Sequence, residues 1–244
     1  MTRRQELDRL VSTGRIVFDD ARTLRPQLSG QTSPWLQDLV IRVAAIGPTL
    51  RVSSVVGGTH EPTSLHYAGR AFDLGNEEIA ATVVPTIATN TDSWHIDELI
   101  FDASMLNGPD GRPLDENLWN YKRGAKFSYS AGVLRPAHRT HVHLSVRFGG
   151  AWRIADSDSS TTVELRQTGN GYGGYLRHEE DGEIETCTLT NLSGNEQELR
   201  GTVTVEETTV AVTLELLNAW QDLRLTMAAE GETDIRVLHA IDPW

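Results

Sequence analysis

The N-terminal half of the chain alternates between helical and strand-like patterns of hydrophobic residues. Residues 6–11 place apolar side chains at helical spacing, and Gly14 is a suitable stop for that helix. A clearer helix begins at Ser33 and Pro34, which suit the N-cap and first helical positions, and its broad apolar stripe extends to Ile46. Strand-like segments occur at 15–18, 49–56, 70–74, 96–102 and 140–148.

Proline and turn-forming residues set the remaining boundaries in this half. Asn76 can cap a further helix, which we expect to end near Val84 because Pro85 discourages its continuation. Residues 107–139 are rich in turn formers and contain several aromatic side chains. A loop of that length in a compact domain is usually functional or contains an unrecognised element.

The pattern changes after Gly149 and Gly150. Short β-prone runs separated by turn signals follow at 161–166, 184–189, 202–205, 208–216 and 234–239. We therefore expect an α+β fold class with two domains. Residues 1–150 would form a small antiparallel sheet flanked by helices, and residues 151–244 an all-β, sandwich-like domain.

Charge separates the same two parts of the chain. The formal net charge is −12, which argues against nucleic acid as a partner. Residues 1–150 contain 16 basic and 16 acidic side chains, whereas residues 151–244 contain 6 basic and 18 acidic ones. The second part is therefore expected to contact a protein partner or a wall glycan by shape and hydrogen bonding, or to aid solubility, rather than to bind an anionic polymer.

Other bulk features narrow the classes of protein further. No apolar run approaches the roughly 20 residues needed to span a bilayer, so we expect no transmembrane segment. The first residues lack the apolar core of a signal peptide. Cys187 is the only cysteine, so any metal must be held by histidines and carboxylates.

One segment offers an imidazole and a carboxylate that a short turn can bring together. His66 lies at the end of a polar loop, Asp73 lies on the strand-like segment that follows, and Gly69 lets the backbone turn between them. Ser64 is expected to cap or orient this loop.

A second histidine cluster lies on the strand-like segment at 140–148. Alternation along a strand places His141 and His143 on one face and the intervening apolar residues on the other, and His138 precedes them. With His66 and Asp73, the cluster supplies two imidazoles and a carboxylate as three metal ligands. A fourth position left for water is typical of a catalytic zinc site.

These residues carry a family resemblance. Ser64-x-His66-x-x-Gly69-x-Ala71-x-Asp73 resembles the motif of the zinc D-alanyl-D-alanine peptidases. That superfamily also contains murein endopeptidases, phage L-alanyl-D-glutamate endolysins and the hedgehog signalling domain. The resemblance covers about half of the chain, roughly residues 33–148, and implies Zn²⁺ bound by His66, Asp73 and His143.

The resemblance also assigns roles to the other histidines. Many members carry a catalytic Glu three residues before the last ligand, where this chain has Thr140. The His-x-x-His-x-His pattern is instead similar to that of the penicillin-insensitive murein endopeptidases. By that match His141 is the base or water-orienting group, and His138 is the stabiliser of the transition state. The alternative for His141 is a hydrogen bond to one of the metal ligands.

The sequence matches the family less well at the position that would bind the carboxylate of the substrate. The family usually has an arginine where this chain has Val56, and Arg51 and Arg70 are the substitutes that the sequence offers. The substrate-binding candidates are therefore Arg70, Ser64 and Arg51.

The function implied by the resemblance is peptidoglycan hydrolysis. A zinc-bound water would attack a stem-peptide or cross-link bond that involves a D-amino acid, and the scissile bond stays open. The alternative is a zinc-containing binding or structural module without hydrolysis, with the β domain as the partner-binding part. A wall hydrolase without an export signal would be made in the bacterial cytoplasm, and would reach the wall as a phage-encoded endolysin or by a non-classical route.

Overall fold

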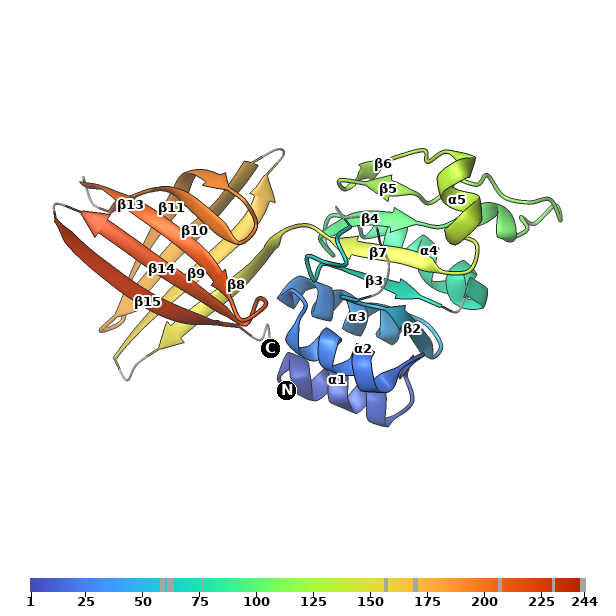
Figure 1. The fold of residues 1–244 in the computed structure, drawn as a ribbon, viewed down its shortest axis with the longest axis horizontal. Helices are drawn as coiled ribbons and strands as arrows, with labels where there is room; N and C mark the ends of the chain where they lie inside the picture. Colours follow the sequence, from blue (N-terminus) through green and yellow to red (C-terminus); the bar gives the residue numbers. More distant parts are fainter. Residues whose placement is uncertain are drawn as a thin grey trace. The chain divides into compact units, whose positions relative to one another are not determined.

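Both helices and sheets are present in the protein, as expected for a mixed α and β class. The computed structural model describes residues 1–57, 60, 64–75, 77–155, 158–168, 171–205, 208–229 and 231–241. The chain divides into two compact units, Met1–Arg147 and Phe148–Pro243 (Figure 1). No described helix has the length and apolar character needed to cross a bilayer.

The N-terminal unit combines helices with one sheet. Its helices are α1 (Arg3–Ser12), α2 (Ala21–Gly30), α3 (Pro34–Ile46), α4 (Ala80–Thr89) and α5 (Ala131–Ala137), with short 3₁₀ turns η1 (Glu77–Ile79) and η2 (Ala103–Met105). Its strands are β1 (Ile16–Phe18), β2 (Leu50–Ser54), β3 (Ala71–Leu74), β4 (Ile96–Ile100), β5 (Tyr121–Lys122), β6 (Ala125–Lys126) and β7 (Val142–Val146).

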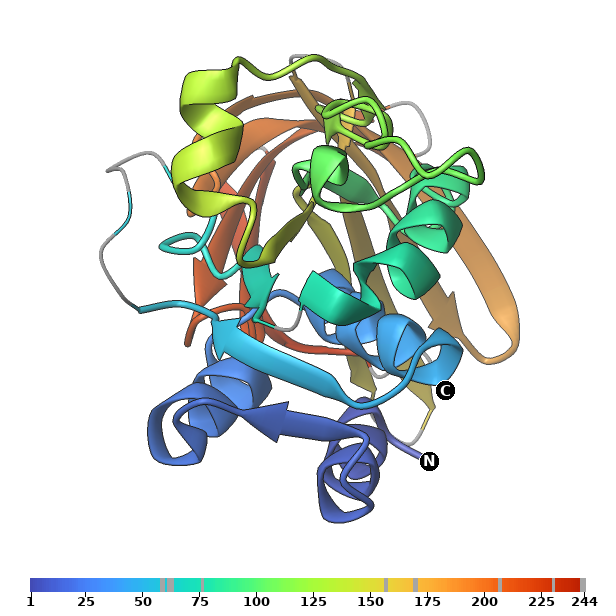
Figure 2. The same cartoon turned by 90° about the vertical axis from the view of Figure 1, so that its right-hand side faces the viewer.

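The sheet of this unit is mixed, which corrects the expectation of a purely antiparallel one. Its strand order is β1-β2-β3-β7-β4-β5-β6, and β1 and β2 are parallel while the other pairs are antiparallel. Two parallel neighbours need a long crossover connection, and α2 and α3 provide it. Figures 1 and 2 place α1 and α2 at the β1 end of the sheet and α5 at the β4–β6 end.

The main core of the unit joins the helices to one face of the sheet. Val142, Leu144 and Val146 of β7 are fully buried in it, together with Phe72 of β3 and Leu99 of β4. The apolar face predicted for this strand is therefore confirmed. A smaller cluster of Ile100, Tyr129 and Leu134 lies apart from this core.

Helices α2, α4 and α5 each contain an internal proline, a residue that usually ends or kinks a helix. Helix α2 was not expected; it runs through Pro26, and the side chain of Asp20 caps its start. Helix α4 continues past Pro85 to Thr89, so the expected end near Val84 is wrong, and Asn76 lies outside the described residues. Helix α5 lies within the segment expected to be a long loop.

The C-terminal unit is an eight-stranded closed barrel, which corrects the expectation of a sandwich-like domain. Its strands are β8 (Gly149–Ala155), β9 (Ser159–Thr168), β10 (Gly171–Glu180), β11 (Glu183–Gly194), β12 (Glu198–Val205), β13 (Thr208–Leu217), β14 (Asp222–Ala229) and β15 (Glu232–Ala240). Each strand pairs with the next, and β8 also pairs with β15, so neither terminal strand is left as an open edge.

Large apolar side chains fill the barrel. Trp152 is fully buried, and its indole N–H donates a hydrogen bond to the carbonyl oxygen of Trp220 at 3.1 Å. Cys187 is buried in the same cluster, as expected for a small hydrophobic side chain. A filled interior is usual for a barrel of eight strands.

Gly69 is required by both its backbone angle and its surroundings. Its φ is +66°, a left-handed conformation in which side chains are strained, and a Cβ there would collide with the carbonyl oxygen of Gln31. The carbonyl oxygen of Gly69 accepts a hydrogen bond from the backbone N–H of Ser33, the N-cap of α3, at 2.8 Å. The turn that carries His66 is thereby fixed to the start of α3.

We predict that Gly69→Ala destabilises the protein more than Gly111→Ala does. Gly111 has a similar φ of +76°, but nothing lies within 4 Å of its added Cβ, so it carries only the backbone strain. Collision with Gln31 should add about 1–3 kcal/mol at Gly69. Urea unfolding of both variants measures the difference, and equal losses of unfolding free energy would contradict this account.

Candidate metal site

The pairing of β3 with β7 places two of the predicted ligands side by side. Asp73 lies directly opposite His143 in the antiparallel register, and Phe72 lies opposite Leu144. Because side chains alternate along each strand, Asp73 and His143 share the face opposite the main core. Both are buried, with 5% and 8% of their surface exposed.

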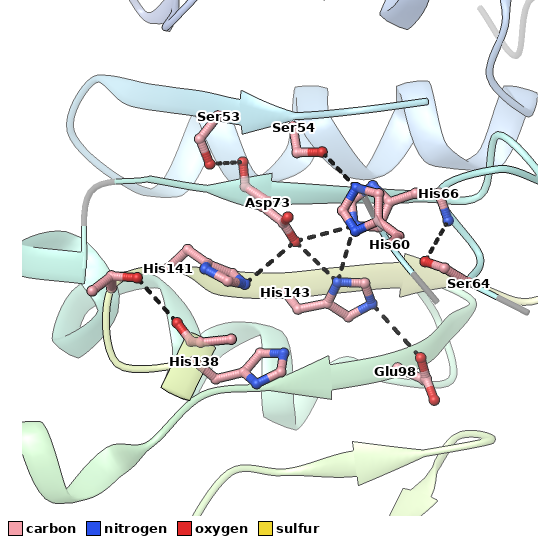
Figure 3. A network of polar contacts seen from close by, with 12 residues as sticks. Ser53, Ser54, His60, Ser64, His66, Asp73, Glu98, His138, His141 and His143 are labelled. Atoms are coloured by element: carbon pink, nitrogen blue, oxygen red, sulfur yellow. Dashed lines mark hydrogen bonds and ion pairs between the residues drawn. The ribbon is translucent and has the colours of Figure 1, made fainter. Parts of the chain in front are cut away.

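The third predicted ligand comes from the turn before β3. The backbone N–H of His66 donates to the hydroxyl oxygen of Ser64 at 3.4 Å, and the role of Ser64 in substrate binding stays a prediction. The imidazole Nδ1 of His66 donates to the carbonyl oxygen of Val55, which can only accept. The other nitrogen, Nε2, is therefore the one that faces Asp73 and His143 (Figure 3).

The separations between the three inward atoms fit a metal ion. Asp73 Oδ1 is 3.0 Å from His143 Nδ1 and 3.3 Å from His66 Nε2, and the two nitrogens are 3.3 Å apart. Ligands about 2.0–2.1 Å from a tetrahedral metal lie about 3.3 Å from one another. The three side chains thus form a buried group that could hold a metal ion.

The polar contacts on the outer sides of the two rings favour the same conclusion. His66 uses Nδ1–H on Val55, and Nε2 of His143 lies 3.6 Å from the carboxylate Oε2 of Glu98. In their neutral forms both rings therefore direct a lone pair inward, toward a carboxylate oxygen. Three electron-rich atoms at these separations repel one another unless a proton or a cation lies among them.

In the metal-free chain, a proton on His143 supplies the positive charge that the three inward atoms need. Burial alone would lower the pKa of His143, but hydrogen bonds with Asp73 and Glu98 and their charges outweigh it and raise the pKa to about 9. Burial would raise the pKa of Asp73, yet its bonds with His143 and His66 hold that pKa far below its usual value. The carboxylate of Asp73 is therefore ionised at neutral pH.

The two predicted catalytic histidines also lie beside this group. His141 Nε2 is 3.9 Å from Asp73 Oδ1, and the ring of His138 lies 5.1 Å from that of His141 and 6.2 Å from that of His143. Burial lowers the pKa of both His138 and His141. Both rings are therefore neutral near pH 7 and able to accept a proton.

Two residues near the site were not predicted to belong to it. The ring of His60 stacks on that of His66 with centroids 4.0 Å apart, and its Nε2 lies 3.1 Å from the hydroxyl oxygen of Ser54. Glu98 lies on β4, and its carboxylate Oε2 is 3.6 Å from Nε2 of His143. No motif in the sequence singles out either residue, since both depend on contacts between distant segments.

The two predicted substrate-binding arginines contact other groups. Arg51 pairs with Asp19 at 2.5 Å on the exposed side of β2. Arg70 is buried, lies 3.5 Å from Asp97, and donates to the carbonyl oxygen of Val146 at 2.9 Å. Both guanidinium groups are thus engaged by groups of the protein, and their role in substrate binding stays a prediction.

The donor set limits the metals that the site would accept. Two imidazoles and one carboxylate, with open coordination positions, suit zinc and are also found in non-haem Fe(II) sites. Comparisons of the chain with protein-family models, curated proteins and solved structures gave no match. The identity of the metal and the chemistry of the site therefore rest on the residues themselves.

We predict that the affinity for Zn²⁺ rises with pH up to about pH 9. His143 must lose its proton to bind a metal, and its pKa is raised to about 9. Below that pH the apparent dissociation constant should fall about tenfold for each unit of pH increase. Competition with a chromophoric chelator measures it, and a constant affinity between pH 7 and 9 would refute the proton competition.

Proposed function

We propose that the protein is a zinc-dependent peptidoglycan peptidase that hydrolyses a stem-peptide or cross-link bond involving a D-amino acid. The observation that carries the proposal is the convergence of His66, Asp73 and His143 at ligand-to-ligand separations of 3.0–3.3 Å, with His141 and His138 beside them. The resemblance of the motif to zinc D-alanyl-D-alanine peptidases supports the choice of reaction and substrate.

The three ligands would hold zinc through His66 Nε2, Asp73 Oδ1 and His143 Nδ1. Zinc bound in such a site supplies a Lewis acid for the carbonyl group and makes hydroxide accessible near pH 7. Burial of the three side chains keeps competing solvent away from these atoms, which strengthens their electrostatic interactions.

His141 is the residue best placed to handle protons. Its Nε2 faces the same oxygen of Asp73 as the ligands do, its side chain is 23% exposed, and burial lowers its pKa. A neutral imidazole in that position can accept a proton from the attacking water and pass it to the leaving amine. In this proposal His141 therefore takes the place of the catalytic glutamate that many zinc D-alanyl-D-alanine peptidases carry.

His138 would act on the developing negative charge. The carbonyl oxygen of Val133 lies 3.0 Å from its Nδ1 and accepts that N–H, and this bond fixes the ring at the end of α5. The ring packs against His141 and His143 and is largely buried. Because Nδ1–H is held by Val133, the neutral ring has only an accepting Nε2, so His138 would first gain a proton on Nε2 and then donate a hydrogen bond to an oxyanion formed next to the ligands.

The test is digestion of purified sacculi by the zinc-loaded chain, followed by mass spectrometry of the released muropeptides. We expect new peptide ends at one defined bond, and metal analysis of the chain as purified, before zinc is added, should give zinc rather than iron. If several peptidoglycan chemotypes stay intact while zinc is tightly bound, hydrolysis is refuted and a zinc-containing binding module becomes the explanation.

Substitution of the histidines should separate metal binding from catalysis. His143→Ala removes a ligand and is expected to abolish both zinc binding and activity. His141→Ala is expected to keep zinc and lose activity by about 100-fold or more. His239→Ala is the matched control. The side chain of His239 lies on a strand of the barrel and is 72% exposed, so its removal should change neither zinc binding nor activity. Zinc retained at full occupancy by His143→Ala would show that the ligand assignment is wrong.

A further inference from the structure

A row of alternating charges crosses four strands of the N-terminal sheet. Asp73 of β3 lies opposite His143 of β7, and Glu98 of β4 lies opposite Lys122 of β5. Ile100 of β4 is the register partner of His143, so Glu98, two residues earlier, shares its face. The row therefore extends from the candidate metal site toward the outer strands of the sheet.

An irregularity in β4 brings Glu98 to this face. Ile96 pairs with Val146 and Leu99 pairs with Leu144, so β4 has one more residue than β7 between these two pairs. In a regular ladder Glu98 would lie opposite Leu144 and point into the main core. The extra residue turns Glu98 to the opposite face, and redirecting a side chain is a recurrent use of such bulges beside functional sites.

The contacts of Glu98 are directed at the candidate ligand. Its Oε2 lies 3.6 Å from Nε2 of His143, and its Oε1 lies 3.8 Å from Nζ of Lys122. Its backbone N–H donates to the hydroxyl oxygen of Ser145 at 2.9 Å, which fixes the bulge against β7. The side chains of Glu98 and His143 are only 20% and 10% exposed, whereas that of Lys122 is 42% exposed.

From this geometry we infer that Glu98 is the positioning residue of the metal site. Its Oε2 lies 3.6 Å from Nε2 of His143, so with a metal on Nδ1 it would accept the Nε2–H and fix the ring with Nδ1 directed toward Asp73 and His66. Histidines that bind metals almost always donate their second N–H to such a partner, and loss of that partner typically weakens metal binding about 10–100-fold. This inference rests on the proposed function, because it requires a metal to be held by His143.

The experiment measures Zn²⁺ affinity of the full chain by competition with a chelating indicator. Glu98→Ala should weaken binding about 10–100-fold, and Glu98→Gln should recover part of that loss because its amide oxygen still accepts the N–H. Lys122→Ala is the matched control. It removes the exposed partner of Glu98 and should leave the affinity within about threefold of wild type.

A spectroscopic readout distinguishes positioning from a general effect on folding. The visible absorption spectrum of the Co²⁺-loaded chain should shift in Glu98→Ala and stay unchanged in Lys122→Ala. If Glu98→Ala does not fold, Glu98→Gln carries the test, with an expected loss of about threefold or more.

The outcomes separate the two proposals. A wild-type chain that binds no zinc overturns both of them. A wild-type chain that binds zinc tightly, with folded Glu98 variants of equal affinity and an unchanged Co²⁺ spectrum, overturns only the role of Glu98 and leaves the zinc peptidase proposal intact.

Discussion

Antiparallel pairing of β3 with β7 is the constraint on which the candidate site depends. The same register sets Phe72 against Leu144 on the core side and Asp73 against His143 on the other. A slip of one residue would move every side chain of the slipped strand to the opposite face, so it would take the apolar residues out of the main core and place a carboxylate or an imidazole there instead. Formation of the hydrophobic core therefore also specifies the arrangement of the two ligands.

Because Asp73 and His143 are buried, their charges are poorly screened by water. Asp73 stays ionised and the rings of His66 and His143 direct nitrogens toward it, so the group needs positive charge at its centre. A proton on His143 meets that need in the metal-free chain, and a divalent cation would meet it more fully. The three ligand atoms are therefore arranged to bind a cation and not to pack as uncharged side chains.

Much of the candidate site could be predicted from the sequence because its residues form local patterns. The spacing of His66 and Asp73 and the alternation after Thr140 indicated a site of histidines and a carboxylate, and the family resemblance singled out His143 as the third ligand of the group that the structure brings together. Glu98 could not be predicted, because a regular strand would point it into the core and a bulge has no clear signature in one sequence. His60 depends similarly on how a distant loop folds back onto His66.

The fold was predictable where local signals dominate. Helix α3 begins after Ser33 and ends at Ile46 as its cap and stripe indicate, whereas α2 and α4 continue through Pro26 and Pro85. Tertiary packing of their buried faces compensates for the hydrogen bond that each proline removes. Closure of the barrel likewise depends on β8 meeting β15, a contact between strands about 80 residues apart that short-range patterns do not encode.

The distribution of lysine confines amine-directed chemical modification to one part of the protein. The sequence has only two lysines, Lys122 and Lys126, and both are exposed on the β5–β6 hairpin. Apart from the N-terminal amine, every amine-reactive dye, cross-linker or support would therefore attach at this hairpin. Acylation of Lys122 would also remove the positive charge next to Glu98. A lysine-specific protease would cut the chain only there, so its cleavage rate would report how often the hairpin opens.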